Sequence, residues 1–217
     1  MTAYLEQVEL FAGLAPAQLE ALARSAQPRV FPRGAVVLNV GDEARGLFVV
    51  QTGSLKAYLM DENGRELTLS IHGPGDYFGE LALLDDAPRS ASVIALERCE
   101  LLHVARPAFF AVLDTNPDSI HVLLRNLVRR IRALTDNVQA LALEDVFGRL
   151  HRLLESLAVA QGEQWIVEPR LTQQEIANRV GASREMVNRI VRELVIGGYL
   201  VLEPQRIVIR RRLPARW

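Results

Sequence analysis

The sequence carries its clearest chemical signal between residues 79 and 91. A turn signal ends an alternating apolar run, and a short helical turn follows. Its backbone N–H groups and the Glu80 carboxylate can hold an anion or a sugar hydroxyl. Arg89 and Ser90 then offer a guanidinium fork and a hydroxyl, which together suit one phosphate group. An acid for ribose hydroxyls beside an arginine for phosphate indicates a nucleotide site. The candidate contact residues are Gly79, Glu80, Leu81, Arg89, Ser90 and Ala91.

The same segment has a simpler interpretation, an ordinary surface loop closed by an internal Glu80–Arg89 ion pair. Short charged loops are common, so the segment alone leaves both interpretations open. The choice depends on whether the surrounding elements can enclose a ligand.

A second set of chemically suggestive residues lies near the C-terminus. Thr172 has the position of a helix N-cap, and Glu175 three residues later completes a capping box. That helix ends near Val180 and Gly181, and after a turn Ser183 caps a second helix that runs to about residue 196. Two helices joined by a glycine-containing turn predict a helix-turn-helix.

The second of these helices carries the side chains that DNA recognition requires. Arginine contacts guanine through two hydrogen bonds, glutamate accepts from the cytosine amino group, and residues at helix starts contact phosphates. Arg184, Glu185 and Arg189 therefore have the types and spacing to read bases, although a solvated charged face with an internal Arg–Glu pair is the alternative. The candidate DNA contacts are Thr172, Gln174, Ser183, Arg184, Glu185, Asn188 and Arg189.

The elements that must position the first set have the period of β-strands. Helical spacing over residues 5–25 gives way to alternation, and Asn63-Gly64 is a strong hairpin signal. Short, evenly spaced strands predict an antiparallel β-roll, jelly-roll-like, with flanking helices and room for a small ligand. The predicted strands are Val36–Leu38, Leu47–Val50, Leu55–Leu59, Leu67–Ile71, Ser92–Leu96 and Glu100–Val104.

One long helix is predicted from Pro117 to about Leu143. Apolar residues recur at both seam positions of three sustained heptads, which indicates a parallel coiled-coil homodimer. A helix that packs against its own domain needs less regularity than this. The predicted seam is Ile120, Leu124, Leu127, Ile131, Leu134, Val138 and Leu141.

The remainder predicts a winged domain. A helix from about Glu144 to Ala160, a strand at Trp165–Val167, and two strands at Tyr199–Leu202 and Arg206–Arg210 accompany the helix-turn-helix. The fold class is therefore α+β. We expect a β-roll domain over 1–116, a dimerisation helix over 117–143, and a winged helix-turn-helix over 144–217.

Composition restricts the function classes. Residues 1–143 carry 13 basic and 17 acidic side chains, whereas 144–217 carry 12 and 9, so the C-terminal part is the one suited to a polyanion. A single cysteine, Cys99, excludes a disulfide framework, a cysteine zinc site and an iron–sulfur cluster within one chain. No apolar run reaches the ~20 residues of a membrane helix, so we expect a cytoplasmic protein without membrane contact. The histidines (His72, His103, His121 and His151) are interpreted as structural, with neither a haem nor a metal site.

With these motifs in place, the chain resembles the cyclic-AMP receptor protein branch of the CRP/FNR family of bacterial transcription regulators. The resemblance covers nearly the whole length, in the family's order. It rests on Gly79-Glu80-Leu81 through Arg89-Ser90-Ala91, on Asp145–Leu150, on Thr172–Ile176, and on Ser183–Arg189.

The resemblance implies cyclic AMP as the effector. It implies that Glu80 bonds the ribose 2′-hydroxyl and that Arg89 and Ser90 bind the cyclic phosphate. It also implies a palindromic operator with TGTGA-type half-sites, read by Arg184, Glu185 and Arg189, and contact with RNA polymerase.

The family's adenine contacts are a threonine and a serine on the dimer helix, and the matching residues here are Leu134 and Thr135. Thr135 keeps a hydroxyl, whereas Leu134 cannot bond the adenine amino group. Cyclic GMP, or activity without any nucleotide, therefore stays open. A regulatory subunit of an enzyme is the alternative from another class, but no nucleophile–base pair, metal spacing or Walker-type loop supports an enzyme.

Overall fold

The computed structural model describes residues 1–162 and 164–214, which form two compact units. The first comprises Met1–Leu59 and Thr68–Arg132; the second comprises Met60–Leu67 and the chain from Ala133 onward. The long helix α5 (Pro117–Leu143) enters both units, so the division falls inside it. Residues 163 and 215–217, which belong to the predicted C-terminal domain, lie outside the described part.

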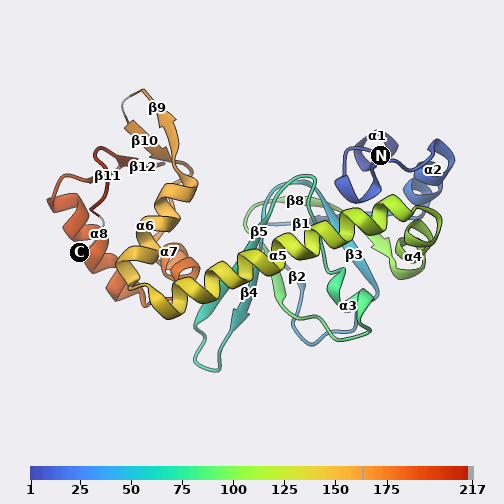
Figure 1. Ribbon diagram of the computed structural model, residues 1–217, viewed down its shortest axis with the longest axis horizontal. Helices are drawn as coiled ribbons and strands as arrows, with labels where there is room; N and C mark the ends of the chain where they lie inside the picture. The colour runs from blue at the N-terminus through green and yellow to red at the C-terminus, as the bar shows by residue number, and fades with distance from the viewer. Residues whose placement is uncertain (163, 215–217) are drawn as a thin grey trace. The chain divides into compact units, whose positions relative to one another are not determined.

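The first unit is an antiparallel β-roll (Figure 1). It is made of two sheets, with strand orders β1-β8-β3-β6 and β2-β7-β4-β5. All six predicted strands are present. Sequence reasoning missed β1, which is mostly exposed, and β6, which has only two residues. The strands are β1 (Gln27–Phe31), β2 (Val36–Leu38), β3 (Gly46–Thr52), β4 (Leu55–Met60), β5 (Glu66–His72), β6 (Tyr77–Phe78), β7 (Ser92–Ala95) and β8 (Cys99–Ala105).

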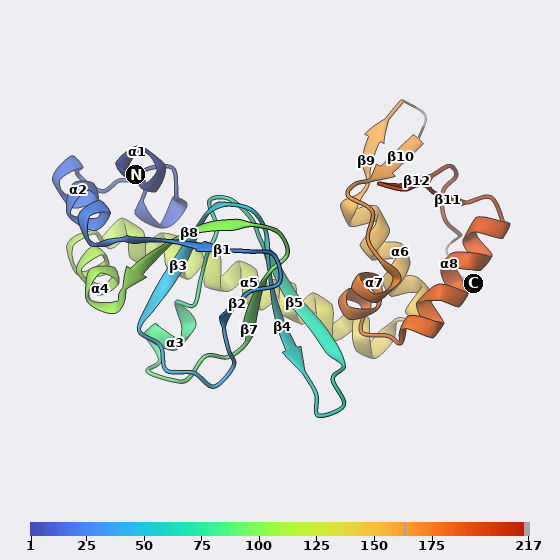
Figure 2. The ribbon, with the colours of Figure 1, turned by 180° about the vertical axis from the view of Figure 1, so that it is seen from behind.

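Helices complete the first unit at one end of the roll. Figures 1 and 2 both show α2 and α4 side by side, where Leu22 and Val112 contribute to a buried apolar core. Ser119 of α5 is fully buried and donates to the Leu10 carbonyl over 2.8 Å, which joins the start of the long helix to the N-terminal helices. The helices are α1 (Thr2–Leu5), a 3₁₀ turn (Glu9–Phe11), α2 (Pro16–Ser25), α3 (Leu81–Leu84) and α4 (Arg106–Thr115).

The second unit holds the helix-turn-helix and a sheet with strand order β11-β12-β10-β9. Its helices pack on a core that contains Phe147, Leu150, Ile176 and Ile190. The elements are α6 (Val146–Leu157), β9 (Val159–Gln161), β10 (Gln164–Val167), α7 (Gln173–Val180), α8 (Arg184–Ile196), β11 (Leu200–Leu202) and β12 (Ile207–Ile209).

The predicted helix from Glu144 to Ala160 is wrong at both ends. Asp145 caps α6 by accepting from the Gly148 N–H over 2.7 Å, so α6 begins only at Val146. At the other end β9 pairs with β10 in antiparallel register. Long-range pairing there outweighs the helical period, and the β-branched Val159 favours the strand.

Helix α5 is continuous, as predicted. The predicted seam residues other than Leu127 are between 41% and 64% exposed, so an apolar stripe runs along the helix surface. Leu127 differs because it packs in part against the core of the roll.

Candidate functional site

The candidate nucleotide cassette begins where β6 pairs with β3 and the chain turns into α3. Phe48 lies opposite Phe78 in this pairing, which fixes the direction of the next residues. Gly79 has a φ of +89°, a left-handed conformation that glycine adopts without strain. A Cβ at Gly79 would lie 2.7 Å from Arg89 Nη1. Only glycine therefore allows the guanidinium to come this close to the backbone.

Arg89 is buried, with 5% of its surface exposed. It donates through Nη1 to the Gly79 carbonyl and through Nη2 to the Gly46 carbonyl, the latter over 2.6 Å. Its own backbone is held as well, because Arg89 N–H donates to the Asp42 carbonyl over 2.9 Å. Burial lowers the pKa of the guanidinium, opposed by the charges of Glu80 and Asp42. The result is a rigid cationic group inside the roll.

Glu80 is more deeply buried, at 1% exposure, and its Oε1 forms an ion pair with Arg130 Nη1. Arg130 also donates through Nη2 to the Tyr77 carbonyl over 2.9 Å. Burial raises the pKa of Glu80, and the charge of Arg130 opposes this rise. The alternative prediction of an internal Glu80–Arg89 ion pair is wrong, because the Glu80 carboxylate pairs with Arg130 of α5 instead.

Two polar atoms of the cassette stand out. Among the residues that the structure describes, neither Glu80 Oε2 nor Arg89 Nε has a hydrogen-bond partner, although both atoms are buried. Buried polar groups are otherwise satisfied in native proteins, and leaving one unsatisfied costs about 1–3 kcal/mol. An acceptor and a donor are therefore available, on the same two residues that the sequence singled out.

Arg130 and Asn126 were not among the predicted site residues. Asn126, one helical turn before Arg130, donates to the Tyr77 hydroxyl over 3.0 Å, so both side chains grip the segment that leads into Glu80. A signal was present in the sequence: Arg130 stands four residues before Leu134, which places both on one face of α5.

The remaining predicted ligand residues lie at the surface. Leu81 and Ser90 are exposed and Ala91 is half-buried. Leu134 and Thr135 are exposed on α5. The structure therefore brings together Gly79, Glu80 and Arg89, and adds Arg130 to them.

The helix-turn-helix has the predicted local structure. Thr172 Oγ1 accepts from the Glu175 N–H over 3.1 Å and Glu175 Oε2 accepts from the Thr172 N–H over 2.6 Å, which completes the capping box. Gly181 ends α7 in the left-handed conformation, with φ +63°. Ser183 caps α8 by accepting from the Met186 N–H over 3.2 Å.

Arg149 of α6 supports this motif from behind. Its Nε donates to the Val180 carbonyl and its Nη1 to the Glu144 carbonyl, both over 2.7 Å. It thus satisfies carbonyls at the C-terminal ends of both α7 and α5, which otherwise lack partners. Together with the apolar core, this side chain holds the C-terminal end of the first helix of the motif.

The predicted DNA contacts on α8 share one exposed face. Val187 and Ile190 of the same helix are buried in the core, so the opposite side faces solvent. Gln174, on α7, donates to Asn178 Oδ1 over 2.8 Å. The predicted contacts that are exposed are Thr172, Gln174, Ser183, Arg184, Glu185, Asn188 and Arg189.

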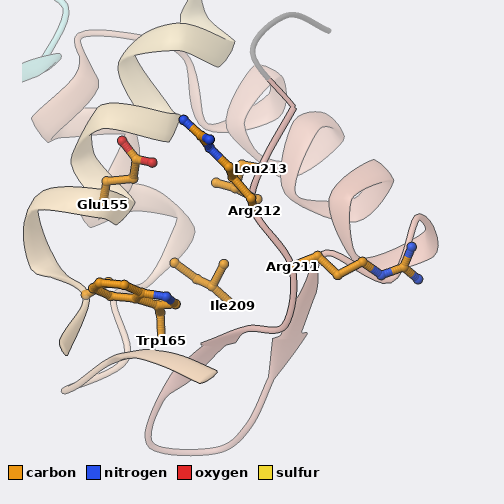
Figure 3. A pocket seen from close by; sticks show the side chains of 7 residues that line it. Glu155, Trp165, Ile209, Arg211, Arg212 and Leu213 are labelled. Carbon is orange, nitrogen blue, oxygen red and sulfur yellow. The ribbon is translucent and has the colours of Figure 1, made fainter. Parts of the chain in front are cut away.

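A hollow of about 360 Å³ lies elsewhere in the second unit (Figure 3). Trp165 and Ile209 are partners across β10 and β12 and lie next to each other on one wall, and Glu155 approaches from α6. Residues 212–213 complete the wall, whereas the Arg211 guanidinium points away. Because its lining comes from α6, the sheet and the segment after β12, we do not assign this hollow to DNA.

The described residues, 1–162 and 164–214, contain neither a metal-binding cluster nor a membrane-spanning helix. Within this part of the chain, no group of three or more His, Cys, Asp or Glu side chains is arranged to hold a metal ion. No helix there combines the length and the apolar character that crossing a bilayer requires.

Comparison with known families adds independent information. Residues 28–116 match the cyclic nucleotide-binding domain, and residues 148–213 match the Crp-like helix-turn-helix domain. A CRP-like cAMP-activated global transcriptional regulator of Mycobacterium tuberculosis is 35% identical over 96% of this chain and 95% of its own length. The chain belongs to the CRP/FNR family. It is a CRP-like, cyclic-nucleotide-binding transcription regulator with a DNA-binding helix-turn-helix.

Other members of this family extend the comparison. The cyclic AMP receptor protein of Thermus thermophilus is 33% identical, over 93% of this chain and 92% of its own length. The solved structure of the regulator CLP of Xanthomonas campestris, described as c-di-GMP responsive, superposes with a TM-score of 0.79 at 25% identity. That alignment covers 91% of this chain and 100% of CLP, so the fold agrees over both units.

Proposed function

We propose that this protein is a homodimeric transcription regulator whose effector is cyclic AMP and whose target is a palindromic operator of the TGTGA type. The M. tuberculosis relative is named as a cAMP-activated regulator, and the T. thermophilus relative is named a cyclic AMP receptor protein. Contact of the DNA-bound protein with RNA polymerase is part of the proposal, by analogy with the family.

The observation that carries the effector proposal is the pair of orphaned polar atoms on Glu80 and Arg89. A ribose hydroxyl donates to a carboxylate oxygen, and a cyclic phosphate accepts from a guanidinium N–H. A cyclic nucleotide therefore supplies both missing partners at once. In this proposal Ser90 adds a hydroxyl to the phosphate, and Thr135 of the partner subunit adds a hydroxyl to the base.

The dimer proposal rests on the apolar stripe of α5. Exposed, contiguous apolar surface at heptad spacing marks a helix that pairs with another helix. Ile131 and Val138, at 62% and 64% exposure, are central to the stripe. We expect Val138→Asp to convert a dimer into monomers by light scattering, whereas the change Gln139→Asp, next to it and off the seam, should leave the mass unchanged.

In the proposed mechanism, the ligand acts through its different affinities for two states of the dimer. Arg130 stands at the relevant place, because it belongs to α5 and already holds the carboxylate that would receive the ribose. A bound nucleotide that shares Glu80 with Arg130 thereby changes the hydrogen bonding of Arg130, and with it the contact between the cassette and the dimer helix. The DNA-reading helices then favour the arrangement that matches two half-sites.

Isothermal calorimetry tests the effector. The purified protein is titrated with cyclic AMP, cyclic GMP and cyclic di-GMP, the last because of the description of CLP. We expect heat with cyclic AMP. Arg89→Ala should bind at least a hundredfold more weakly, because it removes the buried, charge-assisted hydrogen bond that the guanidinium would donate to the phosphate. The exposed Arg98→Ala is the matched control and should bind like the wild type. No heat with any of the three ligands would refute the effector proposal.

A further inference from the structure

The hairpin formed by β4 and β5 is divided between the two units. Most of both strands belongs to the first unit, whereas the tip of the hairpin, Met60–Leu67, belongs to the second. The same tip lies within residues 28–116, which match the cyclic nucleotide-binding domain. A segment of the nucleotide-binding domain is therefore part of the unit that holds the helix-turn-helix.

Glu66, the first residue of β5, connects this hairpin tip to α7. Glu66 Oε2 accepts from Asn178 Nδ2 over 2.8 Å, and Asn178 Oδ1 accepts from Gln174 Nε2 over 2.8 Å. Gln174 and Asn178 are four residues apart on α7 and therefore share a face of the helix. Asn178 is only 9% exposed, so these two hydrogen bonds fix its amide group. The side chain of Gln174 is thereby tied to the carboxylate of Glu66.

Leu67, the next residue of the tip, makes an apolar contact with the end of the same helix. A Cβ on Gly181, the left-handed residue that ends α7, would lie 3.6 Å from Leu67 Cδ1. The same Cβ would lie 2.8 Å from Leu141 Cδ2 of α5. The hairpin tip thus contacts the first helix of the helix-turn-helix at two places, one polar and one apolar.

The polar contact involves one of the predicted DNA contacts. Gln174 is exposed near the start of α7, where side-chain N–H groups can donate to a DNA phosphate. One N–H of its amide already goes to Asn178, and the Glu66 carboxylate follows one hydrogen bond further. A phosphate bound at Gln174 would therefore lie within about 8 Å, one Debye length, of a like charge. The contact of Glu66 with α7 and the binding of DNA by α7 oppose each other.

The other end of β5 packs on the candidate nucleotide cassette. His72, the last residue of the strand, lies against Phe78, with 5.3 Å between ring centroids. Phe78 directly precedes Gly79 and Glu80. One strand therefore contacts the cassette at one end and α7 at the other. Rigid elements that join two sites in this way can carry energetic coupling between them.

We propose that Glu66 is an autoinhibitory contact, which holds α7 in a state that disfavours DNA and which a bound cyclic nucleotide breaks. The release by the nucleotide rests on the proposed effector, whereas the restraint rests on contacts within the second unit. Ligands act here through their different affinities for the restrained and released states. Because coupling is reciprocal, a substitution that breaks the contact should raise the affinity for DNA and for the nucleotide.

The test measures DNA binding of the full chain by fluorescence anisotropy at fixed salt, without and with saturating cyclic AMP. The duplexes are a TGTGA-type palindrome and an unrelated sequence of equal length, because a phosphate contact does not depend on sequence. Without nucleotide, Glu66→Ala should bind both duplexes roughly tenfold more tightly than the wild type, the size of one net hydrogen bond to a charged group. Glu66→Gln keeps a neutral acceptor for Asn178 and should show a smaller gain.

With saturating cyclic AMP these gains should largely disappear, because the wild type is then released as well. In calorimetry, Glu66→Ala should bind cyclic AMP more tightly than the wild type, by at most the factor seen with DNA. Glu62→Ala is the matched control, since it removes an exposed carboxylate from the same hairpin tip. It should bind DNA and cyclic AMP like the wild type.

The outcomes separate this inference from the proposed function. Unchanged or weaker ligand-free DNA binding by Glu66→Ala overturns the restraint, and so does an equal gain by Glu62→Ala, which would make the effect one of net charge. If circular dichroism shows that Glu66→Ala does not fold, Glu66→Gln is judged by the same criteria. A gain that persists undiminished with cyclic AMP overturns the release. A wild type that binds no cyclic nucleotide refutes the proposed effector, and the ligand-free comparison still decides the restraint.

Discussion

The nucleotide cassette and the recognition helix use the same residue types in opposite environments. In the cassette, Glu80 and Arg89 are almost completely buried and are held by carbonyls and by Arg130. On α8, Arg184 and Glu185 are exposed on a capped helix. Buried charges pay a large desolvation cost and suit a small ligand that is enclosed, whereas exposed charges suit a polyanion approached in water.

Substitutions in the two regions should therefore affect different properties of the protein. A change in the cassette should alter stability and pH dependence, because charges there are isolated from solvent. A change on α8 should alter DNA affinity with little effect on stability.

The largest effect is expected from Arg130→Leu. It leaves the Glu80 carboxylate buried without its partner, and we expect the free energy of unfolding to fall by roughly 3 kcal/mol in urea denaturation. Arg98→Leu breaks the exposed pair with Glu100 and should cost less than about 1 kcal/mol. The double variant Arg130→Leu with Glu80→Gln should recover part of the loss. Equal losses of unfolding free energy for Arg130→Leu and Arg98→Leu would contradict the idea that burial of Glu80 makes its ion pair more costly to break.

A pH effect of similar or smaller size should come from His72. Its folded pKa of about 4 lies below the ordinary 6.5, so the unfolded chain binds the proton more tightly. The wild type should therefore lose up to about 3 kcal/mol of stability as the pH falls from 7 to 4, a loss that His72→Leu does not share. Denaturation curves at several pH values measure the difference. Identical pH profiles for the two proteins would contradict the buried neutral imidazole.

On the DNA side, Arg184→Ala should cost about 1–3 kcal/mol of binding to the TGTGA-type site and relax base preference at one position. Binding to a set of single-base operator variants, at fixed salt, measures both. Arg192→Ala, an exposed arginine of the same helix that we did not assign to base reading, serves as the comparison. A uniform loss across all operators would make Arg184 a phosphate contact.

The smallest effect concerns the capping box. Thr172→Ala removes the hydrogen bond to the Glu175 N–H and should destabilise the second unit by about 1 kcal/mol. Thermal unfolding measures this loss, and Thr172→Ser, which keeps the cap, should be near neutral. If Thr172→Ala weakens DNA binding beyond its effect on folding, the hydroxyl also contacts DNA, as predicted from the sequence.

Much of the second unit could be predicted because its signals are local. The capping box at Thr172, the cap at Ser183 and the terminating Gly181 each depend on residues four or fewer positions away along the chain. The continuous helix from Pro117 to Leu143 also follows from the spacing of its own residues. The error at Val159 arose where a local helical period competed with pairing to a strand that comes later in the chain.

For the candidate nucleotide cassette, the sequence by itself determined which residue types are present for the proposed chemistry: Glu80, Arg89 and Gly79, which lets the guanidinium approach the backbone. The tertiary structure alone decided their partners. Glu80 pairs with Arg130, fifty residues away, Arg89 donates to the carbonyl of Gly46, and His72 is buried beside Phe78. Residue types reveal what a group can donate or accept, but burial and long-range partners exist only once the strands and α5 enclose the site, and these determine its charge state.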